Sequence, residues 1–177
     1  IPDEGAAVIV CNHVSFIDWL IISASIKRPA RFVMHYKFFN IPLFKFFFKG
    51  VKAIPIAGRS EDPVLLDKAF DQIARDLEAG EIVCIFPEGK ITADGELNPY
   101  RKGIEQIIKK SPVPVVPMVI DGMWGSFFSR KYGSAISKPS VILKTLWSRV
   151  NMKIGEAIPS ENVSAESLQK LSEKMLK

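Results

Sequence analysis

Short apolar runs that alternate with segments of helical periodicity constrain the fold of this chain more than any other feature. Residues 6–11 (AAVIVC) and 81–86 (EIVCIF) are almost wholly apolar, as expected for strands buried on both faces of a sheet. Apolar residues recur at helical spacing over residues 63–78, a segment that Gly80 ends. This alternation predicts an α/β fold, in which a mixed, largely parallel sheet is flanked by helices on both faces.

The chain has 177 residues, a length that predicts a single domain spanning 1–177. The predicted strands cover residues 6–11, 31–35, 51–56, 81–86, 115–120, 141–146 and 151–154. One predicted helix begins after Ser15, and three others cover residues 63–78, 102–110 and 164–177. The last of these is an amphipathic C-terminal helix. Because the chain begins with isoleucine just before a strand, we expect it to be a fragment of a longer protein.

The composition limits the kinds of ligand and macromolecule that the chain is expected to bind. The formal net charge of +5 suits anionic lipid, phosphorylated ligands or nucleic acid. Neither a dense Lys/Arg run nor an RNA-binding aromatic motif is present, so we expect no nucleic acid partner. The two cysteines, Cys11 and Cys84, lie in apolar runs and are expected to be buried thiols, although a pairing between them stays open. No apolar stretch approaches the roughly 20 residues of a membrane-spanning helix.

Polar side chains follow three of the predicted strands. His13 comes directly after residues 6–11, Arg59 follows residues 51–56, and Glu88 follows residues 81–86. Ligands of open α/β sheets bind at the carboxyl ends of the strands. If the three strands are parallel, we expect His13, Arg59 and Glu88 to converge on one crevice.

The first polar segment contains an H-x-x-x-x-D pair, His13 and Asp18. With His13 in the turn before a helix that Ser15 caps, Asp18 would stand in the first helical turn and accept a hydrogen bond from one imidazole nitrogen. The other nitrogen would then be free to take a proton as a general base. The alternative is that Asp18 only favours the helix N-terminus and His13 is a turn residue.

The second polar segment is Phe-Pro-Glu-Gly-Lys-Ile-Thr at residues 86–92. It places Glu88 beside the expected crevice, where it can hold an acceptor hydroxyl or orient a cation. The alternative is a common P-E-G turn with a solvated glutamate. The stretch 50–59 ends in Arg59, whose guanidinium can clamp a phosphate; the alternative is an exposed arginine at a strand end.

These blocks, in this order and followed by Val-Pro-Val-Val-Pro-Met at 113–118, resemble the glycerol-phosphate and lysophosphatidate acyltransferase family. The resemblance implies a glycerol-phosphate acyltransferase-like fold. It also implies transfer of a fatty acyl group from acyl-CoA or acyl-carrier protein to the free hydroxyl of a lysophospholipid. His13 would be the general base, oriented by Asp18, and the acceptor's polar head would be held by Arg59, Glu88, Gly89, Lys90 and Thr92. No metal or cofactor is expected beyond the acyl donor.

The family pattern is commonly F-P-E-G-T-R-S, and this chain departs from it. Lys90 replaces the threonine, Ile91 replaces the arginine that the family associates with the acceptor's phosphate, and Thr92 stands at the serine. Lys90 would supply only a point charge. A lysophosphatidylethanolamine-type acyltransferase is therefore an alternative, as are a thioesterase and an inactive membrane-binding module.

Aromatic and basic residues alternate over 37–49, which predicts either an interfacial helix or a core helix lining an acyl tunnel. Residues 123–131 are a second candidate membrane contact. With the lipid acceptor, these segments predict association with the cytoplasmic face of a membrane, without a transmembrane helix in this segment. His35 has no carboxylate close to it in the sequence and is expected to be structural.

Overall fold

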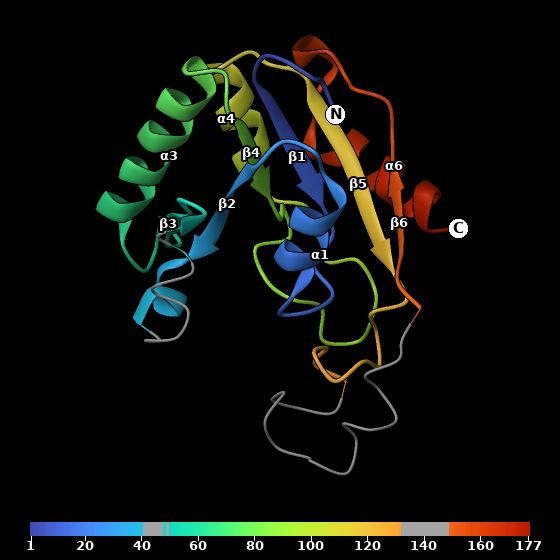
Figure 1. Ribbon diagram of the computed structural model, residues 1–177. Helices are drawn as coiled ribbons and strands as arrows, with labels where there is room; N and C mark the ends of the chain where they lie inside the picture. The colour runs from blue at the N-terminus through green and yellow to red at the C-terminus, as the bar shows by residue number, and fades with distance from the viewer. Residues whose placement is uncertain (41–47, 49, 132–148) are drawn as a thin grey trace.

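The computed structural model describes residues 1–40, 48, 50–131 and 149–177, which form a twisted sheet covered by helices (Figure 1). The six strands of this sheet have the order β3-β2-β4-β1-β5-β6. Their bounds are β1 Ala7–Cys11, β2 Ala30–His35, β3 Ile54–Ile56, β4 Ile82–Ile85, β5 Val115–Asp121 and β6 Asn151–Ile154. All the pairings are parallel except that of β5 with β6. The predicted mixed, largely parallel sheet is confirmed.

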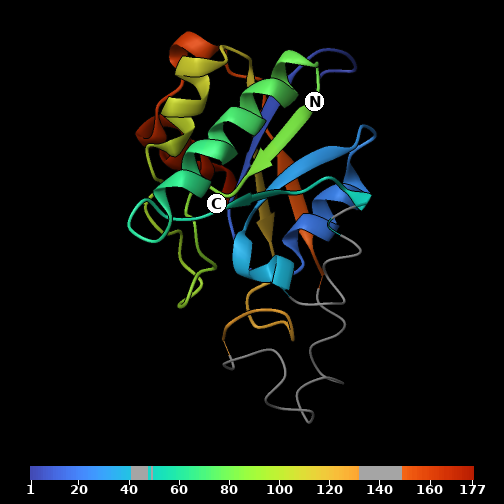
Figure 2. The same cartoon turned by 90° about the vertical axis from the view of Figure 1, so that its left-hand side faces the viewer.

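The helices divide unequally between the two faces of the sheet. They are α1 Asp18–Ser25, α3 Pro63–Glu78, α4 Gly103–Lys110 and α6 Ala165–Leu176, with short 3₁₀ helices at Tyr36–Asn40 and Ser160–Asn162. The apolar cluster on one face includes Trp19 and Ile22 of α1. The cluster on the other face includes residues of α3, α4 and α6. Figure 2 shows α1 on one side of the sheet and α3 and α4 on the other.

Strands β1 and β4 form the centre of the sheet, and every residue in them is buried. Alternate residues of β1 point to opposite faces, so Ile9 joins the cluster under α1 whereas Val8 and Val10 join the cluster under α3, α4 and α6. A strand with two buried faces has no polar side, which explains the continuous apolar run in the sequence.

Two local expectations about the predicted elements are wrong. Helix α1 begins at Asp18 with Ile17 as its N-cap, so Ser15 does not cap it. The Ser15 hydroxyl instead donates to the Asp18 carboxylate within the turn that precedes the helix. The strand expected over 51–56 is shortened to Ile54–Ile56, because Lys52 has a φ of 49° and turns the chain before the strand begins.

The segment 37–49 lies partly outside the described residues, namely at 41–47 and 49, and the strand expected over 141–146 lies wholly outside them. Of the described phenylalanines in 37–49, Phe48 is buried in the core, and Phe38 and Phe39 pack against the same cluster. These three rings therefore contribute to the core on the α1 face. In the part of the chain that the structure describes, the helices are too short or too polar to cross a bilayer.

Candidate active site

The carboxyl end of β1 is joined to β5 by the side chain of Asn12. The Asn12 amide donates from Nδ2 to the Ile120 carbonyl at 2.9 Å and accepts at Oδ1 from the Ile120 N–H at 2.7 Å. Asn12 is buried, so these two bonds replace the water that the amide loses. The residue after it, His13, is thereby held at the end of the central strands. Asn12 was not singled out from the sequence. Its position directly before His13 is the one sequence feature that could have indicated its role.

His13 and Asp18 meet as the H-x-x-x-x-D spacing predicted. His13 Nδ1 lies 2.9 Å from Asp18 Oδ2, and the Asp18 side chain is fully buried whereas that of His13 is 20% exposed. A carboxylate only accepts hydrogen bonds, so the neutral imidazole donates from Nδ1 and keeps the lone pair of Nε2. This arrangement can take a proton from a hydroxyl at Nε2.

Asp18 is itself held by the turn that precedes α1. Its Oδ2 accepts the backbone N–H of Val14 at 2.7 Å and of Ser15 at 2.9 Å, and its Oδ1 accepts the Ser15 hydroxyl. These donors satisfy a fully buried carboxylate and prevent it from turning away from the imidazole. The pair is therefore a preorganised unit built from one short segment.

The rest of His13 is held by residues that follow β4. Its ring stacks on Phe86, with 4.2 Å between ring centroids and 18° between planes. Its carbonyl accepts the Thr92 N–H at 2.9 Å. With Asp18 at Nδ1, these contacts fix both the backbone and the ring of His13.

Glu88 binds the backbone of His13. Its Oε1 accepts the His13 N–H at 2.7 Å, and its Oε2 accepts the backbone and side-chain N–H groups of Asn98 at 2.8 and 2.7 Å. Glu88 is 2% exposed, so the alternative of a solvated glutamate is wrong. Burial raises the pKa of Glu88, and the donors from Asn98 and His13 oppose that rise. Both oxygens are occupied by the protein, and contact with an acceptor stays a prediction.

The other predicted binding residues of this motif differ in exposure. Gly89 has a φ of 67°, and the guanidinium of Arg101 lies where a β-carbon on Gly89 would stand. Lys90 is exposed, whereas Thr92 is buried, with its hydroxyl donating to Asp94 at 2.9 Å and accepting the Gly95 N–H at 3.0 Å. Thr92 thus stabilises the loop, and contact of Lys90 with a ligand stays a prediction.

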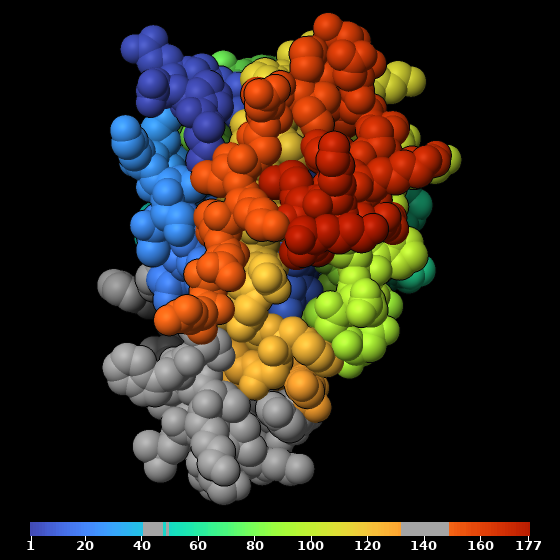
Figure 3. Space-filling view, turned by 90° about the vertical axis from the view of Figure 1, so that its right-hand side faces the viewer, coloured from blue at the N-terminus to red at the C-terminus, as the bar shows by residue number. Residues whose placement is uncertain are grey.

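A small cleft of about 50 Å³ opens beside His13. Its wall includes His13, Glu88, Thr92, Gly95, Asp121 and Trp124. In the space-filling view of Figure 3, blue atoms from the early part of the chain lie in a hollow between the yellow-green segment that follows β4 and the amber segment that follows β5. The ends of β1, β4 and β5 therefore share one cleft. Asn98 and Arg101, which the sequence did not indicate, contact residues 87–89 next to this cleft.

Arg59 is not brought to this cleft. It follows β3 at the edge of the sheet, with β2 and β4 between β3 and β1. Its side chain is 66% exposed, and its guanidinium lies 3.7 Å from the Asp67 carboxylate. The expected convergence holds for His13 and Glu88 and is wrong for Arg59, because parallel strands that follow one another in sequence need not be neighbours in the sheet. Its role in binding a substrate stays a prediction.

His35 has a carboxylate partner that its sequence neighbourhood did not reveal. Its Nε2 lies 2.8 Å from Glu61 Oε2, and Glu61 Oε1 accepts Lys37 Nζ at 2.6 Å and the Tyr36 hydroxyl at 3.2 Å. The hydrogen bonds from Lys37 and His35 lower the pKa of Glu61 to about 2. This cluster joins the end of β2 to the loop before α3.

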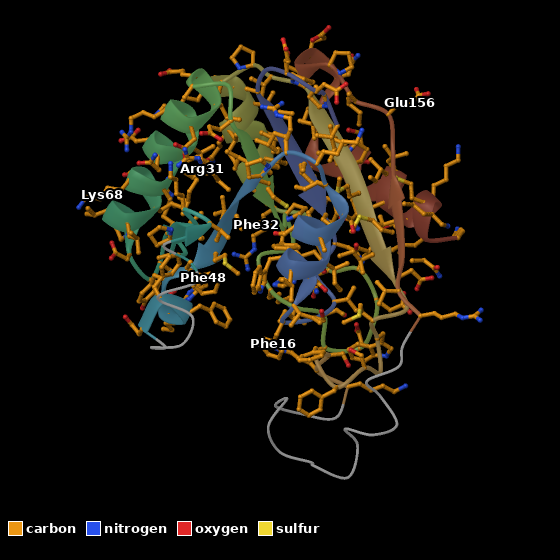
Figure 4. The ribbon with its side chains drawn as sticks, in the orientation of Figure 1. Phe16, Arg31, Phe32, Phe48, Lys68 and Glu156 are labelled. Atoms are coloured by element: carbon orange, nitrogen blue, oxygen red, sulfur yellow. The ribbon has the colours of Figure 1, made fainter. Side chains whose placement is uncertain are left out.

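The segment after β5 contacts the turn that holds His13. The Phe16 N–H donates to the Phe128 carbonyl at 3.1 Å, and the Arg130 guanidinium carbon lies 5.9 Å from the centre of the Phe16 ring. Figure 4 shows Phe16 beyond α1, at the edge of the sheet where β1 ends. Phe16, Phe127 and Phe128 are each half-buried, so aromatic rings and an arginine lie together at this edge.

The cysteines are not suited to nucleophilic chemistry. Cys11 and Cys84 are both buried free thiols, and burial raises the pKa of each. A thiolate is the reactive form, so a raised pKa suppresses it. Across the described ranges, no cluster of three or more His, Cys, Asp or Glu side chains is arranged to hold a metal ion.

Comparison with known proteins agrees with the sequence motifs. The family described as Acyltransferase matches residues 1–121. A putative 1-acyl-sn-glycerol-3-phosphate acyltransferase of Caenorhabditis elegans is 24% identical over 176 residues, covering 96% of this chain and 56% of the relative. The chloroplastic 1-acyl-sn-glycerol-3-phosphate acyltransferase BAT2 of Brassica napus is 30% identical over 119 residues, covering 67% of this chain and 34% of the relative. The chain thus spans between about a third and just over half of the length of these relatives.

The fold agrees as well. The crystal structure of the 1-acyl-sn-glycerophosphate acyltransferase PlsC from Thermotoga maritima superposes with a TM-score of 0.73 at 22% identity, covering all of this chain and 66% of that one. The matched segment of the family, residues 1–121, contains both the His13–Asp18 pair and the Glu88 motif. The chain belongs to the acyltransferase family.

Proposed function

We propose that this chain is the catalytic domain of a phospholipid-biosynthetic O-acyltransferase. It would move a fatty acyl group from acyl-CoA or acyl-carrier protein to the free hydroxyl of a lysophospholipid such as lysophosphatidate. The observation that carries the proposal is the hydrogen bond between His13 Nδ1 and the buried Asp18 carboxylate. The names of the curated relatives support the choice of acceptor.

The reaction would proceed by direct attack. His13 Nε2 takes the proton of the acceptor hydroxyl as its oxygen bonds to the thioester carbonyl carbon, and the carbon–sulfur bond then breaks. The proton passes from His13 to the departing thiolate, which restores the neutral imidazole. Asp18 stabilises the imidazolium between these steps. Neither Cys11 nor Cys84 is accessible for an acyl-enzyme, and the Ser15 hydroxyl is committed to Asp18.

The first experiment is thiol release from palmitoyl-CoA, oleoyl-CoA and an acyl-carrier protein, with and without lysophosphatidate. We expect acceptor-dependent release by the wild type and its loss in His13→Ala. His35→Ala is the matched control, because His35 is also bound to a carboxylate but lies away from the cleft. Release without acceptor would instead establish a thioesterase. Equal activity of wild type and His13→Ala would refute the proposed base.

The buried Ile91 favours a second acceptor, lysophosphatidylethanolamine. Ile91 is 4% exposed and apolar at the position where the family pattern has an arginine. The segment 86–92 therefore lacks an arginine that could bind the second negative charge of a phosphomonoester. A panel of lysophosphatidate, lysophosphatidylethanolamine and glycerol 3-phosphate at matched concentrations distinguishes the candidates by kcat/KM.

We also propose that the domain works on the cytoplasmic face of a membrane and needs no cofactor besides its acyl donor. A lipid acceptor with a long chain resides in a bilayer, and the edge at Phe16, Phe127, Phe128 and Arg130 combines apolar rings with a positive charge. Co-sedimentation with anionic vesicles tests the binding to a membrane, and protease protection of the domain in sealed membranes tests which face it occupies. An unchanged acylation rate after dialysis against EDTA tests the second part of the proposal.

A further inference from the structure

Arg101 lies over the turn that contains Glu88. Its backbone N–H donates to the Pro87 carbonyl at 2.9 Å. The carbon and Nε of its guanidinium group both lie 2.9 Å from where a β-carbon on Gly89 would stand. The guanidinium therefore rests directly on the glycine that follows Glu88, and Glu88 in turn holds the backbone of His13 at 2.7 Å.

The backbone just before Arg101 is held in place by two residues, Asn98 and Tyr100. Asn98 donates twice to Glu88, at 2.8 and 2.7 Å. Tyr100 is buried, with its N–H bound to Gln169 at 3.0 Å and its hydroxyl bound to Ser172 at 2.8 Å. Arg101 is thus presented by a segment that tertiary contacts hold in place, which reduces the entropy lost when its side chain binds a ligand.

The charge of Arg101 is not neutralised by the protein. Its side chain is exposed, and no carboxylate in residues 1–40, 48, 50–131 and 149–177 forms an ion pair with it. By contrast, Arg31 is bound by Asp76 and Glu81. A guanidinium offers paired N–H donors that match the oxygens of a phosphate.

Ile91 cannot supply a cation at this turn, and its side chain is buried. Lys90 is exposed but offers a single point of charge. Among the residues around Gly89, Arg101 is therefore the group with the geometry to bind two phosphate oxygens at once. Nothing in the local motif at 86–92 indicates it, because it is 12 positions beyond Gly89 in the chain.

We propose that Arg101 binds the phosphate of the lysophospholipid acceptor and so determines selectivity for phosphate-bearing acceptors. The proposal rests on the proposed acyl transfer and names the residue that positions its acceptor. A phosphomonoester and a phosphodiester share the required oxygens, so lysophosphatidate and lysophosphatidylethanolamine both fit. Arg101 acts on binding, while His13 takes the proton.

The kinetic test compares wild type, Arg101→Gln and Arg101→Lys with the purified protein. Loss of a charge-assisted pair of hydrogen bonds should raise the acceptor KM of Arg101→Gln by about 10- to 100-fold, with kcat and the donor KM little changed. Arg101→Lys should recover part of this loss. Arg75→Gln, an exposed arginine of α3, is the matched control. A rise in KM for lysophosphatidate alone would restrict Arg101 to monoesters, whereas an unchanged acceptor KM or a rise in the donor KM alone would overturn the proposal.

A binding measurement separates this proposal from the proposed function. Phenylglyoxal labelling of arginines, read by peptide mass spectrometry, is compared in detergent micelles that carry either lysophosphatidate or monoacylglycerol. Lysophosphatidate should slow labelling of Arg101 and leave that of Arg75 unchanged, even if no acyl transfer is seen. Equal labelling of Arg101 in both micelles would overturn the phosphate site, whatever the activity of the enzyme.

Discussion

His13 and His35 show how the surroundings of a residue decide its chemistry. Both rings lie within hydrogen-bond distance of a carboxylate, at 2.9 Å for His13 and 2.8 Å for His35. The partner of His13 is fully buried and accepts from donors in the turn before α1, whereas Glu61 is 32% exposed and shared with Lys37. His13 lies at the end of the central strands and lines the cleft there, whereas His35 does not line that cleft. These differences support the proposal that His13, and not His35, takes the proton of the acceptor hydroxyl.

Replacing Asp18 by asparagine should reduce kcat by about 10²- to 10⁴-fold, because an amide supports the imidazolium poorly. The amide also brings N–H donors to a site where Val14 and Ser15 already donate. Steady-state acyl transfer to the preferred lysophospholipid measures the effect. Asp71→Asn, an exposed carboxylate bound to Lys110, is the control. A kcat of Asp18→Asn equal to that of the control would refute the role of Asp18.

Replacing Gly89 by alanine should destabilise the fold by about 1–2 kcal/mol through its left-handed backbone alone. The added methyl group would also displace the Arg101 guanidinium. Urea denaturation gives the free energy of unfolding, and Gly58→Ala, which meets no atom within 4 Å, is the control. The double variant Gly89→Ala with Arg101→Ala should recover the part of the loss that is due to the contact. Full stability of Gly89→Ala would contradict the described turn.

At the scale of elements, polar contacts in the turns fix how strands and helices are joined. Helix α3 begins after Asp62, whose side chain accepts the Leu65 N–H at 2.9 Å as an N-cap. Lys68 lies on the solvent side of this helix and points away from the sheet in Figure 4. Glu61, directly before the cap, binds His35 at the end of β2 and so joins two elements that the sequence alone does not bring together.

The contacts of Glu61 predict an acid-dependent contribution to stability. Its pKa falls from a usual 4.5 to about 2 on folding, so the folded state binds fewer protons than the unfolded state between these values. The stabilisation is therefore complete above about pH 4.5 and is lost as the pH falls through about 2. Melting temperatures of wild type and Glu61→Gln should differ at pH 6 and approach each other towards pH 2. Parallel curves over that range would contradict the assignment.

At the scale of the whole molecule, α6 contacts both the core beside the sheet and the segment that leads to the candidate active site. Leu168 is fully buried in the cluster with α3 and α4, and Ser172 of the same helix binds the Tyr100 hydroxyl at 2.8 Å. Tyr100 lies between Asn98 and Arg101, which contact the Glu88 turn. A helix at the end of the chain thus stabilises the segment that holds His13 in place.

Replacing Leu168 by alanine should lower the free energy of unfolding by about 2–5 kcal/mol, because the removed side chain leaves a cavity in a fully buried site. Chemical denaturation measures the change. Leu20→Ala, the same substitution at a leucine of α1 that is 45% exposed, is the control and should cost much less. An equal decrease in the free energy of unfolding in the two variants would show that Leu168 of α6 does not contribute to this core.

The sequence by itself determined the class of fold and the pairing of His13 with Asp18. Continuous apolar runs require strands buried on both faces, and His13 and Asp18 are five residues apart, so a single turn brings them together. Only the tertiary structure decided which distant groups meet, because the order of strands depends on how all the helices and strands bury their apolar faces together. That order brings Glu88 to His13 across 75 residues and Asn12 to Ile120 across 108, and it leaves Arg59 at the edge. It also places Arg101 on Gly89, a contact between backbone and guanidinium that no local pattern encodes.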